Sequence, residues 1–340
     1  MVGLPGPELD AETRDFLAEY TPGGVILFKR NVASALQLRR LVAEVKSFGA
    51  GVTPLVAIDH EGGRVHRLPR PFTHFPPAFA VAQCGTATAR RVGLAMAREL
   101  AAVGIDLDFA PVLDVWTNPR NRVIGDRAFG TTPAAAAQGA LALARGLAAG
   151  GVVSCGKHFP GHGSTVGDSH HVLPRVPRTR PELERVDLAP FRRAIAAKLP
   201  TLMTAHVVYP ALDRTKPATL SRRISHDLLR RRLGFRGVLF SDDLEMRAMA
   251  GKRPIERSAI GALAAGCDML LVCHSLAEAA RAIDAVARAT LRGRLDAAAV
   301  VTSLSRIHAL RRRRMPAANG RLGWPAHAAL ARRIARRTAC

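Results

Sequence analysis

The feature that most constrains the fold is a regular alternation of short apolar runs with longer helical segments. Seven apolar runs of strand character can be counted, at residues 24–28, 55–58, 105–112, 152–155, 202–206, 237–240 and 268–272. Segments rich in Ala, Leu and Arg follow them, at 35–48, 87–103, 133–149, 181–197, 225–233, 255–265, 276–292 and 297–313. Near-continuous apolar strands that alternate with helices predict a parallel sheet covered by helices.

The first of these helices shows how local signals support the assignment. Ser34 precedes it and Gln37 follows three residues later, which is the pattern of a capping box. Leu38, Leu41 and Val45 then fall mostly on one face, as an amphipathic helix requires.

The length of the chain and the absence of a linker segment favour a single domain with a closed sheet. No linker rich in Pro, Ser and Gly interrupts the 340 residues, so we expect a single domain over 1–340 with a basic helical C-terminal tail at about 310–340. The predicted fold class is α/β, a (β/α)8 barrel of the TIM type. Only Met1–Leu4 remains to supply an eighth strand, so the barrel is predicted to be irregular or truncated at its N-terminal first strand. A doubly wound sheet is the alternative, but no GxGxxG follows any strand.

Composition indicates which classes of partner and which cellular compartment to expect. Lys and Arg exceed Asp and Glu by 50 − 27 = 23, but the arginines are spread along the chain and aromatic residues make up only 5%. Basic residues are therefore not interleaved with aromatic rings that stack bases, and no nucleic-acid partner is expected. No uncharged apolar run is long enough to cross a membrane, and the N-terminus lacks a signal-peptide pattern. The five scattered cysteines form no CxxC, so we expect a cytoplasmic protein, a monomer with reduced thiols.

Polar residues stand where the predicted strands end. They are Asp59, Asp114, Lys157 with His158, His206 and Asp242. In a parallel barrel these ends share one face, which is the face that carries the chemistry. A single such residue is more often a helix cap, but the repetition predicts a site.

The stretch from Lys157 to Pro174 is the densest in polar groups. Its sequence, KHFPGHGSTVGDSHHVLP, holds four histidines and is broken by Gly and Pro, which predicts a loop after a strand that ends at Cys155. His158, His162, Asp168 and His170 could be proposed as metal ligands, but their spacing matches no helical HExxH-type pattern. We therefore expect no metal site.

Three motifs together resemble family 3 glycoside hydrolases. They are Asp59-His60-Glu61-Gly62-Gly63-Arg64-Val65-His66-Arg67, the stretch KHFPGHG with DSH and LP after it, and Ser241-Asp242-Asp243-Leu244-Glu245-Met246. The set is most similar to the single-domain bacterial β-N-acetylhexosaminidases of cell-wall recycling, and the resemblance covers essentially the whole chain.

The resemblance implies a role for several residues. Asp242 would be the catalytic nucleophile, and His170 the general acid/base in a dyad with Asp168. The remaining implied residues bind the N-acetylglucosamine unit: Asp59, Arg67, Arg127, Lys157 and His158. No metal or organic cofactor is implied, and the implied substrate is a muropeptide such as N-acetylglucosaminyl-anhydromuramyl-peptide.

Elementary chemistry agrees with this assignment. A retaining glycosidase needs one carboxylate to trap the anomeric carbon and an acid to protonate the leaving oxygen. A histidine suits the second role because its ordinary pKa lies near neutrality. His60 and His66 stand where the family commonly has Gln, and no role is assigned to them or to His162 and His171.

Two alternatives remain. A family 3 glycosidase of other specificity, such as a β-glucosidase, is less favoured because those enzymes usually take the acid/base from a later domain. A non-catalytic barrel that binds carbohydrate or nucleic acid would lack catalytic residues, yet Asp242, His170 and Asp168 are all present.

Overall fold

The computed structural model describes residues 1–49, 52–165, 173–250, 253–312 and 323–338. Within them, eight parallel strands neighbour one another in the order β1-β2-β3-β4-β5-β6-β9-β10. Their bounds are β1 Val2–Gly3, β2 Gly24–Leu27, β3 Leu55–Ile58, β4 Leu107–Asp108, β5 Val153–Phe159, β6 Thr201–Thr204, β9 Val238–Asp243 and β10 Met269–Leu271. A parallel bridge between Val2 and Val272, with the Gly3 amide donating to the Val272 carbonyl at 3.0 Å, joins the last strand to the first.

The prediction of a (β/α)8 barrel is therefore confirmed, and the doubly wound alternative is set aside. The irregularity predicted at the N-terminal first strand is also present. The first strand is only two residues long, and Val2 and Gly3 pair with Val25 and Ile26 of β2. A Cβ on Gly3 would lie 1.9 Å from the Cys273 carbonyl oxygen, so this short strand fits closely against the end of β10.

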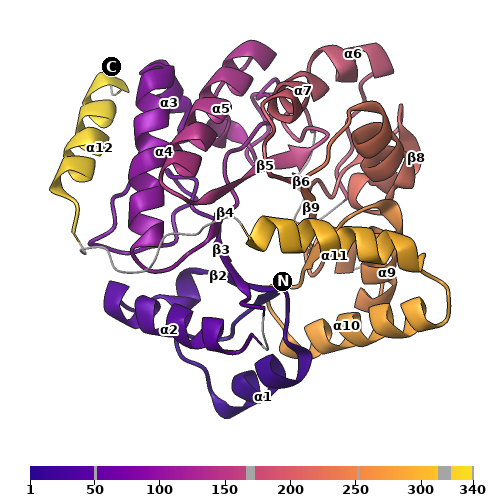
Figure 1. Cartoon of the computed structure of the whole chain (residues 1–340). Helices are drawn as coiled ribbons and strands as arrows, with labels where there is room; N and C mark the ends of the chain where they lie inside the picture. The colour runs from indigo at the N-terminus through magenta and orange to yellow at the C-terminus, as the bar shows by residue number, and fades with distance from the viewer. Residues whose placement is uncertain (50–51, 166–172, 251–252, 313–322, 339–340) are drawn as a thin grey trace.

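Helices surround the strands (Figure 1). The longer ones are α1 Ala11–Tyr20, α2 Ala35–Ser47, α4 Thr86–Ala101, α5 Pro133–Ala149, α9 Ile255–Ala265 and α10 Leu276–Leu291. Shorter ones are α3 Ala78–Gln83, α6 Arg180–Arg185, α7 Leu188–Ala196, α8 Arg247–Ala250 and a π-type segment at Arg223–Arg232. A small antiparallel hairpin, β7 Val208–Tyr209 and β8 Asp213–Pro217, follows β6. The capping box at Ser34 and Gln37 is present as predicted.

Several sequence-based boundaries were wrong, among them the strand expected over 105–112, where β4 covers only Leu107–Asp108. The helix expected over 181–197 is divided into α6 and α7 at Val186–Asp187, because the buried side chain of Asp187 bonds to other segments instead of capping α7. The strand expected to end at Cys155 continues to Phe159. Lys157 and His158 can lie inside this strand because buried carboxylates pair with both of them.

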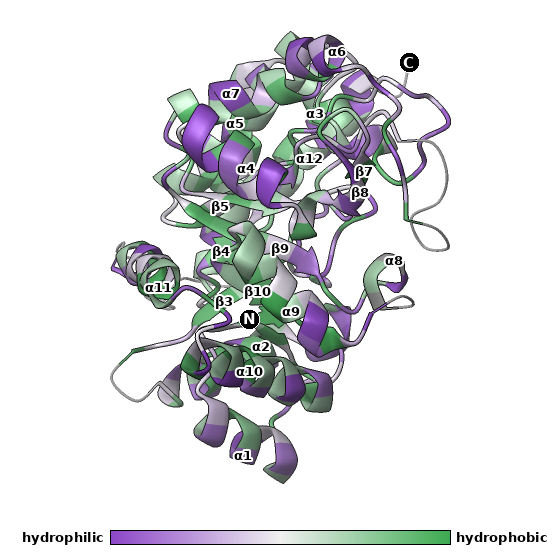
Figure 2. Cartoon of the chain, turned by 90° about the vertical axis from the view of Figure 1, so that its right-hand side faces the viewer, coloured by the Kyte–Doolittle hydropathy of each residue, from purple (hydrophilic) through white to green (hydrophobic). Residues whose placement is uncertain are grey.

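Two apolar layers hold the barrel together, and the strands are the most hydrophobic part of the ribbon in Figure 2. Phe109 and Phe240 meet edge to face inside the barrel, with ring centroids 5.2 Å apart. Helix α11 (Ala297–Arg311) lies across the N-terminal ends of β6 and β9 (Figure 1), where its buried Ile307 and Leu310 join the same cluster. This end of the barrel is therefore closed by apolar side chains.

The last helix, α12 (Pro325–Thr338), packs against α3 and α4. Leu330 and Ile334 are buried there, and the His327 Nδ1 atom lies 2.8 Å from the buried carboxylate of Glu99. The arginines of α12 are exposed. The prediction of one domain over 1–340 with a basic tail stays a prediction. Among the described residues, no helix combines the length and apolar character needed to cross a membrane.

Candidate functional site

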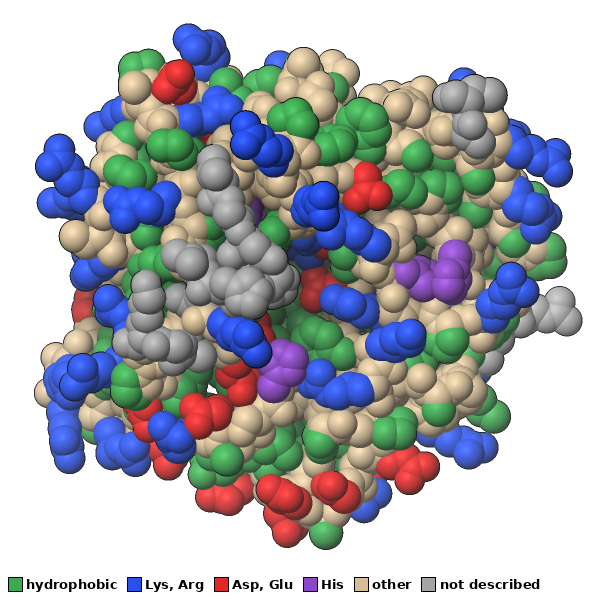
Figure 3. Space-filling model, turned by 180° about the vertical axis from the view of Figure 1, so that it is seen from behind, with side chains coloured by type: hydrophobic (Ala, Val, Ile, Leu, Met, Phe, Trp, Pro, Cys, Tyr) green, Lys and Arg blue, Asp and Glu red, His purple; other side chains and the backbone are tan. Residues whose placement is uncertain are grey.

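The polar strand ends meet on the face opposite α11. Figure 3 shows this face, where acidic and basic side chains gather round a hollow near its centre. Asp59 follows β3, Lys157 lies in β5, and Asp242 lies in β9. Because parallel strands in a barrel end at one face, residues about 100 positions apart become neighbours.

An ionic cluster forms one side of this site. The Lys157 Nζ atom lies 2.6 Å from Asp59 Oδ1 and 2.6 Å from Glu61 Oε1. The Arg127 guanidinium binds Glu61 through two nitrogens, each at 2.7 Å. Two carboxylates and two cations thus compensate one another in a place where the lysine side chain is only 2% exposed.

The cluster has clear electrostatic consequences. Burial alone would raise the pKa of Glu61, but the charges of Arg127 and Lys157 outweigh it and hold the pKa far below its ordinary value. Burial likewise opposes the charged form of Lys157, yet Asp59 and Glu61 raise its pKa. Glu61 and Lys157 are therefore both ionised at neutral pH.

A buried carboxylate next to this cluster has the opposite character. Asp108 accepts a hydrogen bond from the His60 amide at 2.9 Å, while its Oδ2 atom has no partner among the described residues. Burial raises the pKa of Asp108 well above its ordinary value, and the charges of Asp59 and Glu61 add to the rise. Burial therefore favours the neutral form of Asp108.

Asp114 organises the loop that follows β5. Its carboxylate lies 2.8 Å from His158 Nδ1 and accepts the His162 amide at 2.7 Å. Burial raises the pKa of Asp114, but His158 and His162 outweigh burial and lower it. Since the ionised Asp114 accepts a hydrogen from Nδ1, the Nε2 atom of His158 is left for other partners.

Asp242 and Asp243 point to different neighbours. Asp242 is half-buried, and its Oδ1 accepts the Asp243 amide at 2.8 Å. Burial raises the pKa of Asp242, but nearby His206 and His158 outweigh that effect, so its pKa lies below the ordinary value. Asp243 accepts the Glu245 amide at 3.1 Å and lies 3.2 Å from His274 Nε2. Asp243 thus fixes the turn that follows β9, before α8 begins at Arg247.

His206 binds the backbone carbonyl of Asp243. Its Nε2 atom lies 2.8 Å from the Asp243 carbonyl, and its Nδ1 atom lies 2.8 Å from Thr219 Oγ1. A carbonyl can only accept, so Nε2 carries the hydrogen. Burial lowers the pKa of His206, which favours this neutral form.

Arg67 places a hydrogen-bond donor without an acceptor at the edge of the site. Its buried Nε atom has no hydrogen-bond partner among the described residues, and its guanidinium lies 5.8 Å from the centre of the Phe28 ring. Next to it, the His66 ring lies between those of His60 and His74, with ring centroids 4.4 and 3.7 Å away and the ring planes tilted by 47° and 46°. Burial, followed by the charge of His74, lowers the pKa of His66 to about 4, so His66 is uncharged at neutral pH.

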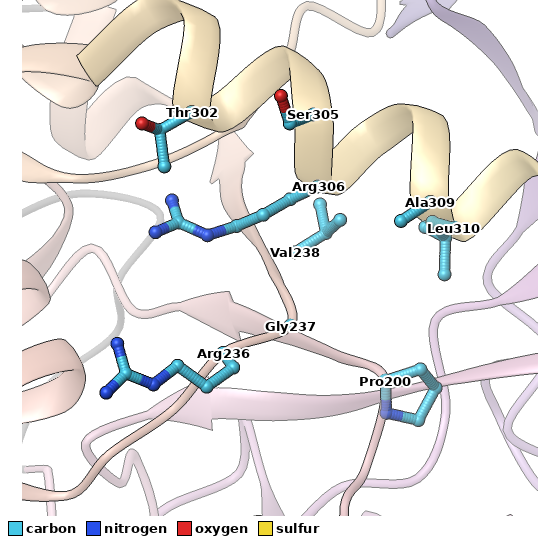
Figure 4. A pocket seen from close by; sticks show the side chains of 9 residues that line it. All are labelled: Pro200, Arg236, Gly237, Val238, Thr302, Ser305, Arg306, Ala309 and Leu310. Carbon is cyan, nitrogen blue, oxygen red and sulfur yellow. The ribbon is translucent and has the colours of Figure 1, made fainter. Parts of the chain in front are cut away.

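A separate cavity of about 350 Å³ lies under α11, at the other end of the barrel (Figure 4). Its two hydroxyl groups already have partners: Thr302 and Ser305 donate to carbonyls of their own helix, at 2.8 and 2.9 Å. Arg306 is paired with Asp268 at 2.8 Å. The strand-end face, which gathers unpaired and ionised groups, is the better candidate site.

Five of the sequence-predicted site residues, Asp59, Lys157, His158, Arg127 and Asp242, meet in this arrangement, and Arg67 stands at its side. Asp168, His170 and His171 lie outside the described residues. Sequence reasoning gave no role to Glu61, Asp114 and His206. Asp114 and His206 had a signal, because both are polar residues at strand ends, and Glu61 stands within the first motif.

No group of three or more His, Cys, Asp or Glu side chains is arranged to hold a metal ion in the described part of the chain. The carboxylates of the site are instead neutralised by lysine, arginine and histidine. This arrangement suits the binding of hydroxyl groups, which need both acceptors and donors.

Comparisons with known proteins identify the family. A model of the glycosyl hydrolase family 3 N terminal domain matches residues 2–310. The beta-hexosaminidase of Chromobacterium violaceum is 46% identical over 297 residues, which are 84% of this chain and 82% of that protein. A family 3 beta-N-acetylglucosaminidase structure from Paenibacillus sp. has a TM-score of 0.95 at 37% identity, over 99% of this chain and 67% of that one. NagZ from Neisseria gonorrhoeae, in complex with N-trifluoroacetyl-D-glucosamine, has a TM-score of 0.82 at 38% identity, over 99% and 97%. The chain therefore belongs to glycosyl hydrolase family 3, the family that its motifs resemble.

Proposed function

We propose that this protein is a retaining exo-β-N-acetylglucosaminidase with Asp242 as nucleophile and His170, assisted by Asp168, as general acid/base. The observation that carries the proposal is the position and the ionisation of the Asp242 carboxylate. Its carboxylate stands half-buried at the end of β9, and its pKa is lowered although burial alone would raise it, chiefly by His206 and His158. An ionised carboxylate beside donors and acceptors for a sugar is what nucleophilic attack on an anomeric carbon requires.

The reaction has two balanced steps. In the first, a carboxylate oxygen of Asp242 attacks C1 of the terminal sugar, the bond from C1 to the leaving oxygen breaks, and His170 gives that oxygen its proton. In the second, His170 takes a proton from water, the water oxygen attacks C1, and the bond from C1 to Asp242 breaks. Two inversions give net retention. Asp168 would orient the imidazole and raise its pKa, as a carboxylate does in a catalytic triad.

The ionic cluster supplies the contacts that hold the sugar. Asp59 is 19% exposed, so its carboxylate can accept hydrogen bonds from sugar hydroxyls while Lys157 fixes it. Arg127 and Lys157 are held in place by Glu61, and both retain N–H groups for sugar oxygens. Arg67 Nε, buried and without an acceptor among the described residues, would gain one from the ligand. His158 would accept a hydrogen bond from a sugar hydroxyl at Nε2, because its Nδ1 hydrogen is donated to Asp114.

The enzyme class, a β-N-acetylhexosaminidase, rests on the relatives as well as on the site. The curated relatives are named beta-hexosaminidases, and a structural relative was solved with an N-acylated glucosamine. The finer substrate is a proposal: a terminal β-1,4-linked N-acetylglucosamine on a muropeptide in cytoplasmic cell-wall recycling, processed by a monomer. A net charge of +23 would attract an anionic anhydromuramyl-peptide. Association rates that do not change with salt would remove this part of the proposal.

The test compares matched p-nitrophenyl glycosides. We expect release from the β-N-acetylglucosaminide and none from the β-glucoside, with the β-anomer of the sugar formed first, as seen by proton NMR. Asp242→Ala should lower kcat by at least about 10³-fold while the fold, measured by circular dichroism, is kept. Near-normal turnover by Asp242→Ala would refute the assignment of the nucleophile.

A further inference from the structure

Asp187, a buried carboxylate outside the sugar-binding cluster, bonds to both segments that flank residues 166–172. Its Oδ1 atom accepts a hydrogen bond from Ser164 Oγ at 2.9 Å, just before that stretch. Its Oδ2 atom lies 3.4 Å from Arg178 Nε, after the stretch; this is an ion pair without hydrogen-bond geometry. The carboxylate is 0% exposed, so these contacts are shielded from water.

The side chain of Asp187 does not cap the helix that it precedes. It stands at the N-cap of α7, where an aspartate commonly accepts hydrogen bonds from the first turn. Here the side chain makes no such bond. Its burial therefore serves the two flanking segments and not the helix.

Neighbouring contacts fix the same two segments to the barrel. Gly161 packs so closely on Asp187 that an added Cβ would lie 2.7 Å from the Asp187 Cβ, and the Gly161 carbonyl accepts the buried Tyr209 hydroxyl at 2.7 Å. On the other side, Arg178 also donates to Thr117 Oγ1 at 2.8 Å, and the Val176 amide donates to the Val208 carbonyl at 2.9 Å. Asp187 is a single side chain that contacts both sides.

We infer that Asp187 is a positioning residue, which sets the distance between the two flanking segments and so places the acid/base group carried between them. The inference rests on the proposed function, because Asp168 and His170 belong to that stretch by sequence. Asp187 does not touch substrate. It acts through Ser164 and Arg178, so its loss should affect proton transfer more than sugar binding.

The test uses two aryl β-N-acetylglucosaminides that differ in their need for an acid. Phenol requires protonation as it leaves, whereas 2,4-dinitrophenol does not. We expect Asp187→Ala to lower kcat/KM for the phenyl glycoside by about 100-fold and for the dinitrophenyl glycoside by less than about threefold. Dinitrophenolate should appear as a burst, and azide, which needs no general base, should restore turnover.

Two milder variants keep the test useful if Asp187→Ala does not fold. Asp187→Asn keeps an acceptor for Ser164 but loses the charge that pairs with Arg178, and Ser164→Ala removes one contact. Both should show the same leaving-group dependence at smaller size. A matched control is Ser303→Ala under α11, since the Ser303 hydroxyl donates to the buried carboxylate of Asp268 as Ser164 donates to Asp187, but far from the site. It should leave the ratio between the two substrates unchanged.

His170→Ala, measured alongside, separates this inference from the proposed function. If His170→Ala shows the leaving-group dependence and the Asp187 variants lower both substrates equally, the positioning role is wrong while the proposed function stands. If His170→Ala itself shows no such dependence, the acid/base assignment falls and the role of Asp187 falls with it. A leaving-group dependence and azide rescue in both sets of variants would establish the inference.

Discussion

Replacing Lys157 by methionine should reveal how strongly the ionic cluster is coupled. Lys157 Nζ contacts Asp59 and Glu61 at 2.6 Å each, and its side chain is 2% exposed. Methionine has similar length, so the main loss is the charge. Removing one partner of a buried ion pair costs about 3–5 kcal/mol because the remaining charge is left uncompensated. We expect Lys157→Met to lower the free energy of unfolding by about that amount at pH 7.

The effect should depend on pH with a definite sign. The pKa of Glu61 is lowered in the folded protein, so Glu61 contributes stability above its unfolded pKa, and that contribution is lost as pH falls. Lys157→Met removes part of this contribution. The difference in stability between the wild type and the variant should therefore be largest near pH 7 and shrink towards pH 3.

Urea unfolding, followed by circular dichroism, measures these free energies. A double-mutant cycle with Glu61→Gln should give a coupling of about 1–3 kcal/mol, because the two side chains are in contact. Lys46→Met is the matched control, since Lys46 also lies 2.6 Å from an aspartate, Asp106, but is 26% exposed. It should cost about 1 kcal/mol or less. Equal losses for the two lysine variants, or additive effects in the cycle, would refute this account of the cluster.

Three further predictions concern stability. Burial and His158 lower the pKa of His162 to about 4, so as pH falls below about 6.5 the unfolded chain takes up a proton at this residue before the folded protein does. We therefore expect the free energy of unfolding to fall by about 3 kcal/mol between pH 7 and pH 4. Urea unfolding at both pH values measures this loss, which should be absent in His162→Gln. The raised pKa of Asp108 means that its ionisation destabilises the fold as pH rises, so Asp108→Asn should gain stability relative to the wild type between pH 4 and pH 8; a constant difference would contradict this. Asp268→Asn leaves the buried Arg230 without its counter-ion and should lower unfolding free energy by about 3–5 kcal/mol, and an unchanged Tm would count against it.

The barrel could be predicted because its signals are local. The runs at 24–28 and 55–58 are apolar throughout, as strands covered on both sides must be, and Ser34 with Gln37 mark a helix start through bonds within four residues. Strand ends in a parallel barrel converge, so Asp59, Lys157 and Asp242 could be assigned to one face before any coordinates were known.

The break at Val186–Asp187 had no such local signal. Composition over 181–197 is that of a helix, and propensity alone predicts continuity. The chain departs from helix there because Asp187 makes its contacts with Ser164 and Arg178. Likewise, strand β5 passes through Lys157 and His158, against their polarity, because Glu61 and Asp114 supply opposite charge.

The fold class, the face that carries the site and the family follow from the order of residues, because periodicity and motifs involve residues that are close in the chain. Which charges meet depends on the folded chain. The pairing of Glu61 with Arg127, of Asp114 with His158 and of Asp187 with both flanks of 166–172 joins residues that lie 9 to 66 positions apart. Such contacts depend on strand register and on the path of loops over the barrel end. Ionisation then follows from burial and from these neighbours, and neither can be read from the order of residues alone.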